Sequence, residues 1–240
     1  MKSKHDDRSV KHWETRSESA WKGFRFNQPY QRGLSRLREE VLSKTNFDPS
    51  TLWQWGTMQA MAVIEILKTV EARFGQEGQQ AVLESLCRVG YEIGQQVTEG
   101  TSIPEDMTNA EWLSFYATIM NRIAYASLES PQIVKDDLVN FHIDWCPHQD
   151  EYKAMDCRVQ RYFVQGMMDA AIDFLKSQGR EDIWDIAFRR TIPAGSETCF
   201  FEMERGKPNE PRKWAEYTRF IEQKALEIAK KEGGSKSLRE

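Results

Sequence analysis

The chain lacks the sequence signatures of most common active sites. It contains no phosphate-binding P-loop, no glycine fingerprint of a dinucleotide-binding fold and no GxSxG nucleophile elbow. It also has no CxxC or HExxH spacing, the arrangements that most readily indicate a zinc site. These absences argue against the common nucleotide-binding and serine-hydrolase classes, so a function has to be argued from less regular groups of residues.

Long apolar runs and an excess of basic charge are also missing. No apolar stretch approaches the ~20 residues that span a bilayer, and residues 1–19 are charged without the apolar core of a secretory signal. The 33 basic and 37 acidic residues give a net charge of −4, which argues against nucleic-acid binding. We therefore expect a cytoplasmic protein with reduced cysteines and without a nucleic-acid or membrane partner.

What the chain does contain is enough apolar and aromatic material for a core and a cavity. Its 240 residues are 40% hydrophobic and 11% aromatic, which suffices for a substantial core. Eight tryptophans are many for this length, and tryptophan lines pockets and interfaces as well as cores. A small-molecule cavity is therefore expected, and base rates favour a homodimer or another homo-oligomer.

The first half of the chain carries helical patterns. Residues 1–30 predict a mobile arm, whose aromatic end would be held against the body by Trp21, Phe24, Phe26 and Tyr30. Segment 52–74 is apolar on more than one side, which predicts a centrally buried helix that ends at Gly75. Gly90 and Gly94 predict a close approach of a neighbouring backbone or ligand. Helices are expected at 31–44, 52–74, 79–97 and 108–126.

The second half predicts a small sheet. Residues 138–146 alternate with period two, so one face would carry Val139, Phe141, Ile143 and Trp145 and the other Asn140, His142, Asp144 and Cys146. Two more strands, at 183–191 and 198–204, should form a hairpin through the loop 193–196. Further helices are expected at 157–176 and, on the surface, at 214–231.

These patterns predict an α+β fold. An N-terminal helical bundle of about four helices would pack on a small antiparallel β-sheet, with one inserted helix and a C-terminal helix. The expected organisation is an arm at 1–30, one α+β catalytic or ligand-binding domain at 31–206, and a linker, helix and polar tail at 207–240.

The side chains best suited to metal binding or catalysis lie between the strand 138–146 and the next helix. Cys146, His148 and Cys157 follow one another here, and Pro147 should break the strand and turn His148 back toward Cys146. Thiolate and imidazole are ligands that zinc favours, so one interpretation is a divalent metal such as zinc held by Cys146, Cys157 and His148.

Three other interpretations of the same residues stay open. Cys146 could be a catalytic nucleophile, with His142 or His148 as base and Asp144 or Glu151 orienting the imidazole. Cys146 and Cys157 could be a redox thiol pair or cluster ligands. The cysteines could also simply be core side chains, most clearly Cys199, which shares a strand face with Phe201 and Met203.

An arginine could hold the carboxylate of a substrate. Arg161 is the candidate because guanidinium binds carboxylate with two hydrogen bonds, and Trp145 and Tyr162 are candidates for aromatic contacts to the same substrate. The competing expectation is that Arg158, Arg161, Arg189 and Arg190 all lie on the surface.

Three segments carry a resemblance to a known family. They are the helical "EARFGQEGQQAVLESLCRVGYEIGQQ", the pair "HIDWCP" and "DCRVQRYFVQGMMDAAI", and the hairpin "TIPAGSETCFFEME". Together they resemble the L-2-amino-thiazoline-4-carboxylic acid hydrolase family and, more distantly, 4-vinyl-reductase-type small-molecule domains, over Trp53 to Glu204. The resemblance implies a mixed helical and antiparallel fold around a cavity, and hydrolytic opening of a small sulfur- and nitrogen-containing ring that bears a carboxylate. Its matching positions are Cys146, Cys157 and Cys199.

Two functional hypotheses follow. The first is a hydrolase that cleaves a C–N or C–S bond of a small carboxylate-bearing substrate, with catalytic residues among Cys146, His142, His148 and Asp144. The alternative is a non-catalytic small-molecule sensor or binding domain with the cysteines in its core.

Overall fold

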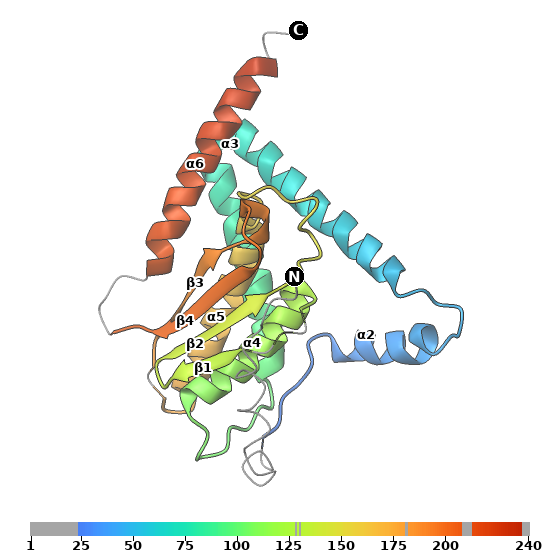
Figure 1. Cartoon of the computed structure of the whole chain (residues 1–240), viewed down its shortest axis with the longest axis vertical. Coiled ribbons are helices and arrows are strands. Elements are labelled where there is room, and N and C mark those ends of the chain that lie inside the picture. Colours follow the sequence, from blue (N-terminus) through green and yellow to red (C-terminus); the bar gives the residue numbers. More distant parts are fainter. Residues whose placement is uncertain (1–23, 128, 130, 181, 208–212, 237–240) are drawn as a thin grey trace.

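Two helices cover one face of a four-stranded sheet, and a long bent helix packs behind them (Figure 1). The computed structural model describes residues 24–236 apart from 128, 130, 181 and 208–212. The sheet order is β1-β2-β4-β3 with every pair antiparallel, so the predicted α+β fold is confirmed. The elements are α2 (Gln31–Arg36), a π-helical turn (Leu37–Leu42), α3 (Ser50–Thr98), α4 (Asn109–Tyr125), β1 (Gln132–Lys135), β2 (Leu138–Ile143), α5 (Arg158–Ser177), β3 (Trp184–Arg190), β4 (Cys199–Arg205) and α6 (Lys213–Lys236).

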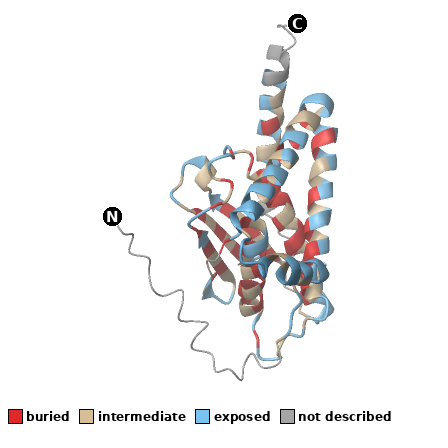
Figure 2. Ribbon diagram, turned by 90° about the vertical axis from the view of Figure 1, so that its right-hand side faces the viewer, coloured by how far each residue is buried: buried red, intermediate tan, exposed pale blue. Residues whose placement is uncertain are grey.

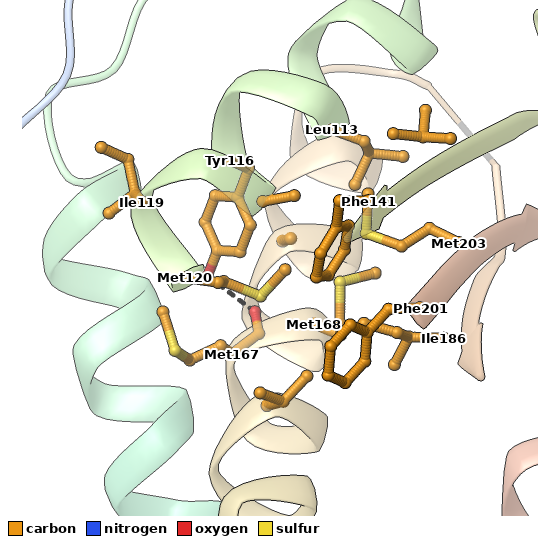
Figure 3. Close-up of a cluster of buried hydrophobic side chains, with 14 of the residues drawn as sticks. Leu113, Tyr116, Ile119, Met120, Phe141, Met167, Met168, Ile186, Phe201 and Met203 are labelled. Carbon is orange, nitrogen blue, oxygen red and sulfur yellow. Dashed lines mark hydrogen bonds between the residues drawn. The ribbon is translucent and has the colours of Figure 1, made fainter. Parts of the chain in front are cut away.

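The main core lies between the sheet and helices α4 and α5. Alternate residues of the strands point inward, so that Phe141, Phe201 and Met203 meet Met120 of α4 and Met168 of α5 (Figure 3). Phe141 and Phe201 stack across β2 and β4 with ring centroids 4.9 Å apart. The hairpin predicted from the alternation of 183–191 and 198–204 is confirmed as β3 and β4. Strand β1 was not predicted. Its four residues do not alternate between buried and exposed positions, so its sequence lacks the period-two pattern of a half-buried strand.

Helix α3 is bent sharply at Gly75, whose φ of 61° and ψ of −136° lie outside the helical region. Residues 50–74 form a first arm and residues 76–98 a second arm. Ile64 and Leu67 of the first arm pack against Leu86 of the second arm and against Val159 and Tyr162 of α5. Gly75 therefore ends the first helical segment, as predicted, and turns the chain back on itself.

The prediction that segment 52–74 is buried is wrong. On the first arm only Ile64, Leu67 and Glu71 are buried, whereas Trp55, Met58 and Ile66 are 57–61% exposed. The reason is that the arm is covered on one side only, by the second arm and α5, and the described residues leave its other apolar side uncovered. Figure 2 shows exposed residues along the outer sides of the helices.

Glycines allow α3 and α5 to touch backbone to backbone. A Cβ atom on Gly90 would lie 2.1 Å from the carbonyl oxygen of Phe163, and one on Gly166 would lie 1.9 Å from that of Cys87. The close approach predicted at Gly90 is confirmed.

Replacing Gly166 with alanine should destabilise the protein by about 1–3 kcal/mol or more, because the methyl group can be accommodated only by moving a backbone. The matched control is Gly56→Ala in α3, where a Cβ meets no atom within 4 Å; alanine there should be neutral or stabilising by up to ~1 kcal/mol. Urea-induced unfolding measures both. Equal stability of Gly166→Ala and the parent protein would contradict this helix crossing.

The two ends of the described chain join the same folded unit. Phe24 and Phe26 both pack on Phe115 of α4, with ring centroids 4.5 and 4.6 Å away, as predicted for the end of the arm; the predicted mobility of residues 1–23 and the contact of Trp21 lie outside the described residues. Helix α6 packs on α3 and β3, and its Ala225 is buried. It therefore belongs to the body of the protein. No helix within the described ranges is long and apolar enough to cross a membrane.

Candidate functional site

The loop between β2 and α5 does not continue the alternation of the strand. Strand β2 ends at Ile143, opposite Cys199 of β4, and after it Trp145 is exposed while Cys146 is buried. The predicted shared face of His142, Asp144 and Cys146 is therefore wrong, because the chain turns before Pro147. His142 is exposed and contacts Phe200, with ring centroids 4.6 Å apart.

The three cysteines of the second half gather around one tyrosine. Cys146, Cys157 and Cys199, here called the thiol cluster, all act on the buried hydroxyl of Tyr125, which burial and these neighbours give a strongly raised pKa. Each sulfur interacts with a hydrogen-bond donor. The donors are the backbone N–H of His148 for Cys146, the Thr191 hydroxyl for Cys157 and the backbone N–H of Ile192 for Cys199.

Burial keeps these thiols protonated. It raises the pKa of Cys157 to about 12 and that of Cys199 to about 11, and it also raises the pKa of Cys146. Because the thiolate is the reactive form of cysteine, this environment argues against a thiol nucleophile or a redox pair at neutral pH. Within the part of the chain that the structure describes, no three His, Cys, Asp or Glu side chains are placed to hold a metal ion, so the zinc site of Cys146, Cys157 and His148 stays a prediction.

A cavity of about 600 Å³ lies between the first arm of α3, the end of α4, the loop and α5. We call it the tryptophan cavity because Trp53 of the first arm and Trp145 of the loop both line it. Most of the remaining lining is apolar, and the side chains that bring polar atoms are few. Its lining residues are Leu52, Trp53, Gly56, Thr57, Gln59, Ala60, Val63, Ile93, Ile123, Ala124, Ala126, Trp145, Pro147, His148, Tyr152, Val159, Gln160, Phe163 and Met167.

Three buried polar atoms in this lining have no hydrogen-bond partner among the described residues. They are Nδ1 of His148 and the hydroxyl oxygens of Thr57 and Tyr152. The His148 ring stacks on Tyr152 with centroids 4.9 Å apart, and burial lowers the pKa of His148 below its usual value. The imidazole is therefore neutral at pH 7, with a nitrogen able to accept a proton or a hydrogen bond.

The other two residues predicted to bind substrate, Arg161 and Tyr162 of α5, do not line the tryptophan cavity. Val159, Phe163 and Met167 recur at four-residue spacing and face the tryptophan cavity, whereas Tyr162 lines a separate polar cavity of about 540 Å³ against α6. Arg161 lines neither. Its guanidinium lies over the rings of Tyr217 and Phe188, 4.3 and 5.1 Å from their centroids, and burial lowers its pKa to about 10.

Of the predicted residues, the tryptophan cavity therefore brings together only His148 and Trp145. The expectation of a surface position is wrong for Arg158 and Arg161, which are buried, and holds for Arg189 and Arg190. The sequence interpretation also missed Trp53, Thr57, Tyr152 and Gln160. One feature of the sequence could have indicated the cavity. The small residues Gly56, Thr57 and Ala60 interrupt a run of large side chains and leave room beside the helix.

Comparison with known proteins places the chain in a family without describing its chemistry. No protein-family model matches the sequence. A protein of Archaeoglobus fulgidus (strain ATCC 49558), described as an uncharacterized protein, is 50% identical over 216 residues, which cover 90% of this chain and 95% of the relative. The chain belongs to the same family as this archaeal protein.

Proposed function

We propose that the protein binds a small ring-containing molecule in the tryptophan cavity and hydrolyses a C–N or C–S bond in it, with His148 as general base. The observation that carries the proposal is the set of three buried, unpartnered polar atoms in one mostly apolar cavity, which are His148 Nδ1 and the hydroxyls of Thr57 and Tyr152. Buried polar atoms normally have partners, and a concave apolar site with a few polar atoms is typical of a ligand pocket.

The chemistry assigned to His148 needs no thiolate. A neutral imidazole can take a proton from a water molecule while the water oxygen attacks the electrophilic ring carbon, and the protonated imidazole can then return that proton to the leaving nitrogen or sulfur. The Thr57 hydroxyl would hold a polar atom of the ring. The resemblance to a ring-opening hydrolase family supports this reaction class.

The lining favours a substrate that is largely uncharged inside the cavity. Among the described residues, none in the lining is lysine or arginine, so a substrate carboxylate would lie toward the opening, where Gln59 is exposed. Arg161 is not the partner of such a carboxylate, because it is buried beneath Tyr217 of α6.

Binding and turnover can be measured separately. L-2-Amino-thiazoline-4-carboxylate and a panel of small aromatic heterocycles serve as probes, with tryptophan fluorescence and thermal shift as readouts and product detection by chromatography. Ala60→Phe fills the cavity and should abolish binding, whereas Ala72→Phe, exposed on the same arm and outside the lining, should leave it intact. Binding that survives Ala60→Phe would exclude this cavity as the site.

A non-catalytic binding domain is the second candidate function. It is favoured by the raised pKa values of the thiols and of the Tyr152 hydroxyl, which leave His148 as the one described side chain in the lining that can act as a base near neutral pH. A probe that binds, is lost on Ala60→Phe and never yields product would support this candidate over the hydrolase.

A further inference from the structure

The first arm of α3 is apolar on two opposite sides. Its inner side, with Trp53, Ala60 and Ile64, meets the tryptophan cavity and the core. Its outer side carries Trp55, Met58, Ala62 and Ile66, here called the outer stripe, at spacings of three and four residues along one helix face. All four are exposed, and Trp55 and Ile66 are 61% and 57% exposed. No described residue covers this stripe.

Helix α2 and the π-helical turn after it are a second uncovered element. Neither contains a buried residue, although Leu34, Leu37 and Val41, all half-buried, give them an apolar side. Figure 1 shows α2 projecting from the body, away from the sheet. A helical segment of 12 residues (Gln31–Leu42) is marginal by itself in water, so it needs a surface to pack on.

We propose that the outer stripe is a homodimer interface, in which the first arms of two copies pack antiparallel across a two-fold axis at Ala62. In this arrangement Met58 of each copy faces Ile66 of the other, and Trp55 faces Thr69. The stripe is thus complementary to itself, as an isologous interface requires. The small side chain of Ala62 at the crossing point lets the two helices approach closely.

The size of the uncovered surface agrees with a dimer. With Trp55, Met58 and Ile66 each more than half exposed, the outer stripe presents an apolar patch on the order of several hundred Å², the size of the largest patch on a typical monomer. The apolar side of α2, packed against the partner's first arm, brings the buried area toward the ~800 Å² per partner of a stable complex. Because the other side of the same arm lines the tryptophan cavity, dimerisation would also hold one wall of that cavity in place.

A cysteine at the two-fold axis tests the interface directly. Ala62→Cys in the full-length chain should form a disulfide-linked dimer on mild oxidation, visible on a non-reducing gel, since the two sulfurs would meet across the axis. Glu84→Cys, exposed on the second arm, is the matched control and should stay monomeric on the gel. The native cysteines are half-buried or buried.

Solution mass gives an independent readout. Light scattering should report twice the chain mass of 28.0 kDa for the parent protein and a shift toward 28.0 kDa for Met58→Arg. Val134→Arg, at a 49% exposed apolar position on β1, should remain dimeric. A monomeric parent protein without the Ala62→Cys crosslink overturns the proposal, and that is the result expected if residues 1–23 or another protein covers the stripe.

Discussion

Replacing Arg158 with methionine should lower the free energy of unfolding at neutral pH by about 3–5 kcal/mol. Arg158 of α5 and Glu71 of the first arm form an ion pair at 2.5 Å, with both side chains almost completely buried. Glu71 also accepts a hydrogen bond from the Gln79 amide at 2.6 Å. Methionine fills the space of the arginine stem but leaves the carboxylate without its counter-charge, which is the costly state of a buried pair.

The pH dependence of this loss identifies its cause. Burial raises the pKa of Glu71, and the charge of Arg158 opposes that rise. Without Arg158 the pKa rises further, so Glu71 takes up a proton as the pH falls from 7.5 to 5.5 and the deficit against the parent protein should shrink. Urea-induced unfolding at both pH values measures this change.

Two further variants separate charge from packing. Glu71→Leu with Arg158→Met removes both charges and should recover most of the lost stability, whereas Lys176→Met breaks only the exposed pair with Asp173 and should cost less than about 1 kcal/mol. A double variant as unstable as Arg158→Met would show that packing, and not an unpaired charge, causes the loss.

The elements of the fold could be predicted where local pattern and tertiary contact agree. The hairpin of β3 and β4 follows from alternation on both sides of a turn. Helix α4, predicted at 108–126, begins with a capping box of Thr108 and Glu111. The burial of the first arm could not be predicted, because an apolar pattern on two sides of a helix does not say whether the second side meets its own chain or a partner.

The site was less predictable than the fold, for a related reason. The phase of residues 142–146 depends on where β2 stops pairing with β4, and that end is set by Cys199, which is remote in sequence. Likewise, the two partners Arg158 and Glu71 are 87 residues apart, so no local spacing indicates that this arginine is buried. Residue types indicated which side chains could do chemistry, and only the fold showed which of them meet.

Replacing His148 of the loop should have a much larger effect on activity than replacing His142 of β2. For a probe that the tryptophan cavity binds and hydrolyses, His148→Gln should lower kcat about 10²–10⁴-fold, as expected for loss of a general base. KM should change little, because the apolar lining that binds the ring stays intact. His142→Gln is the matched control, since His142 lies against Phe200 and outside the cavity lining, and it should retain the parent rate.

The pH–rate profile provides a second test of the same assignment. Since burial lowers the pKa of His148 below the usual 6.5, the imidazole stays neutral, and therefore basic, until the pH falls below that value. The rate should be level at pH 7 and fall on an acidic limb with a midpoint under 6.5, and that limb should disappear in His148→Gln. A limb that persists in His148→Gln would assign the titration to another group. A rate lost in His142→Gln instead would place the chemistry on the outer face of the sheet.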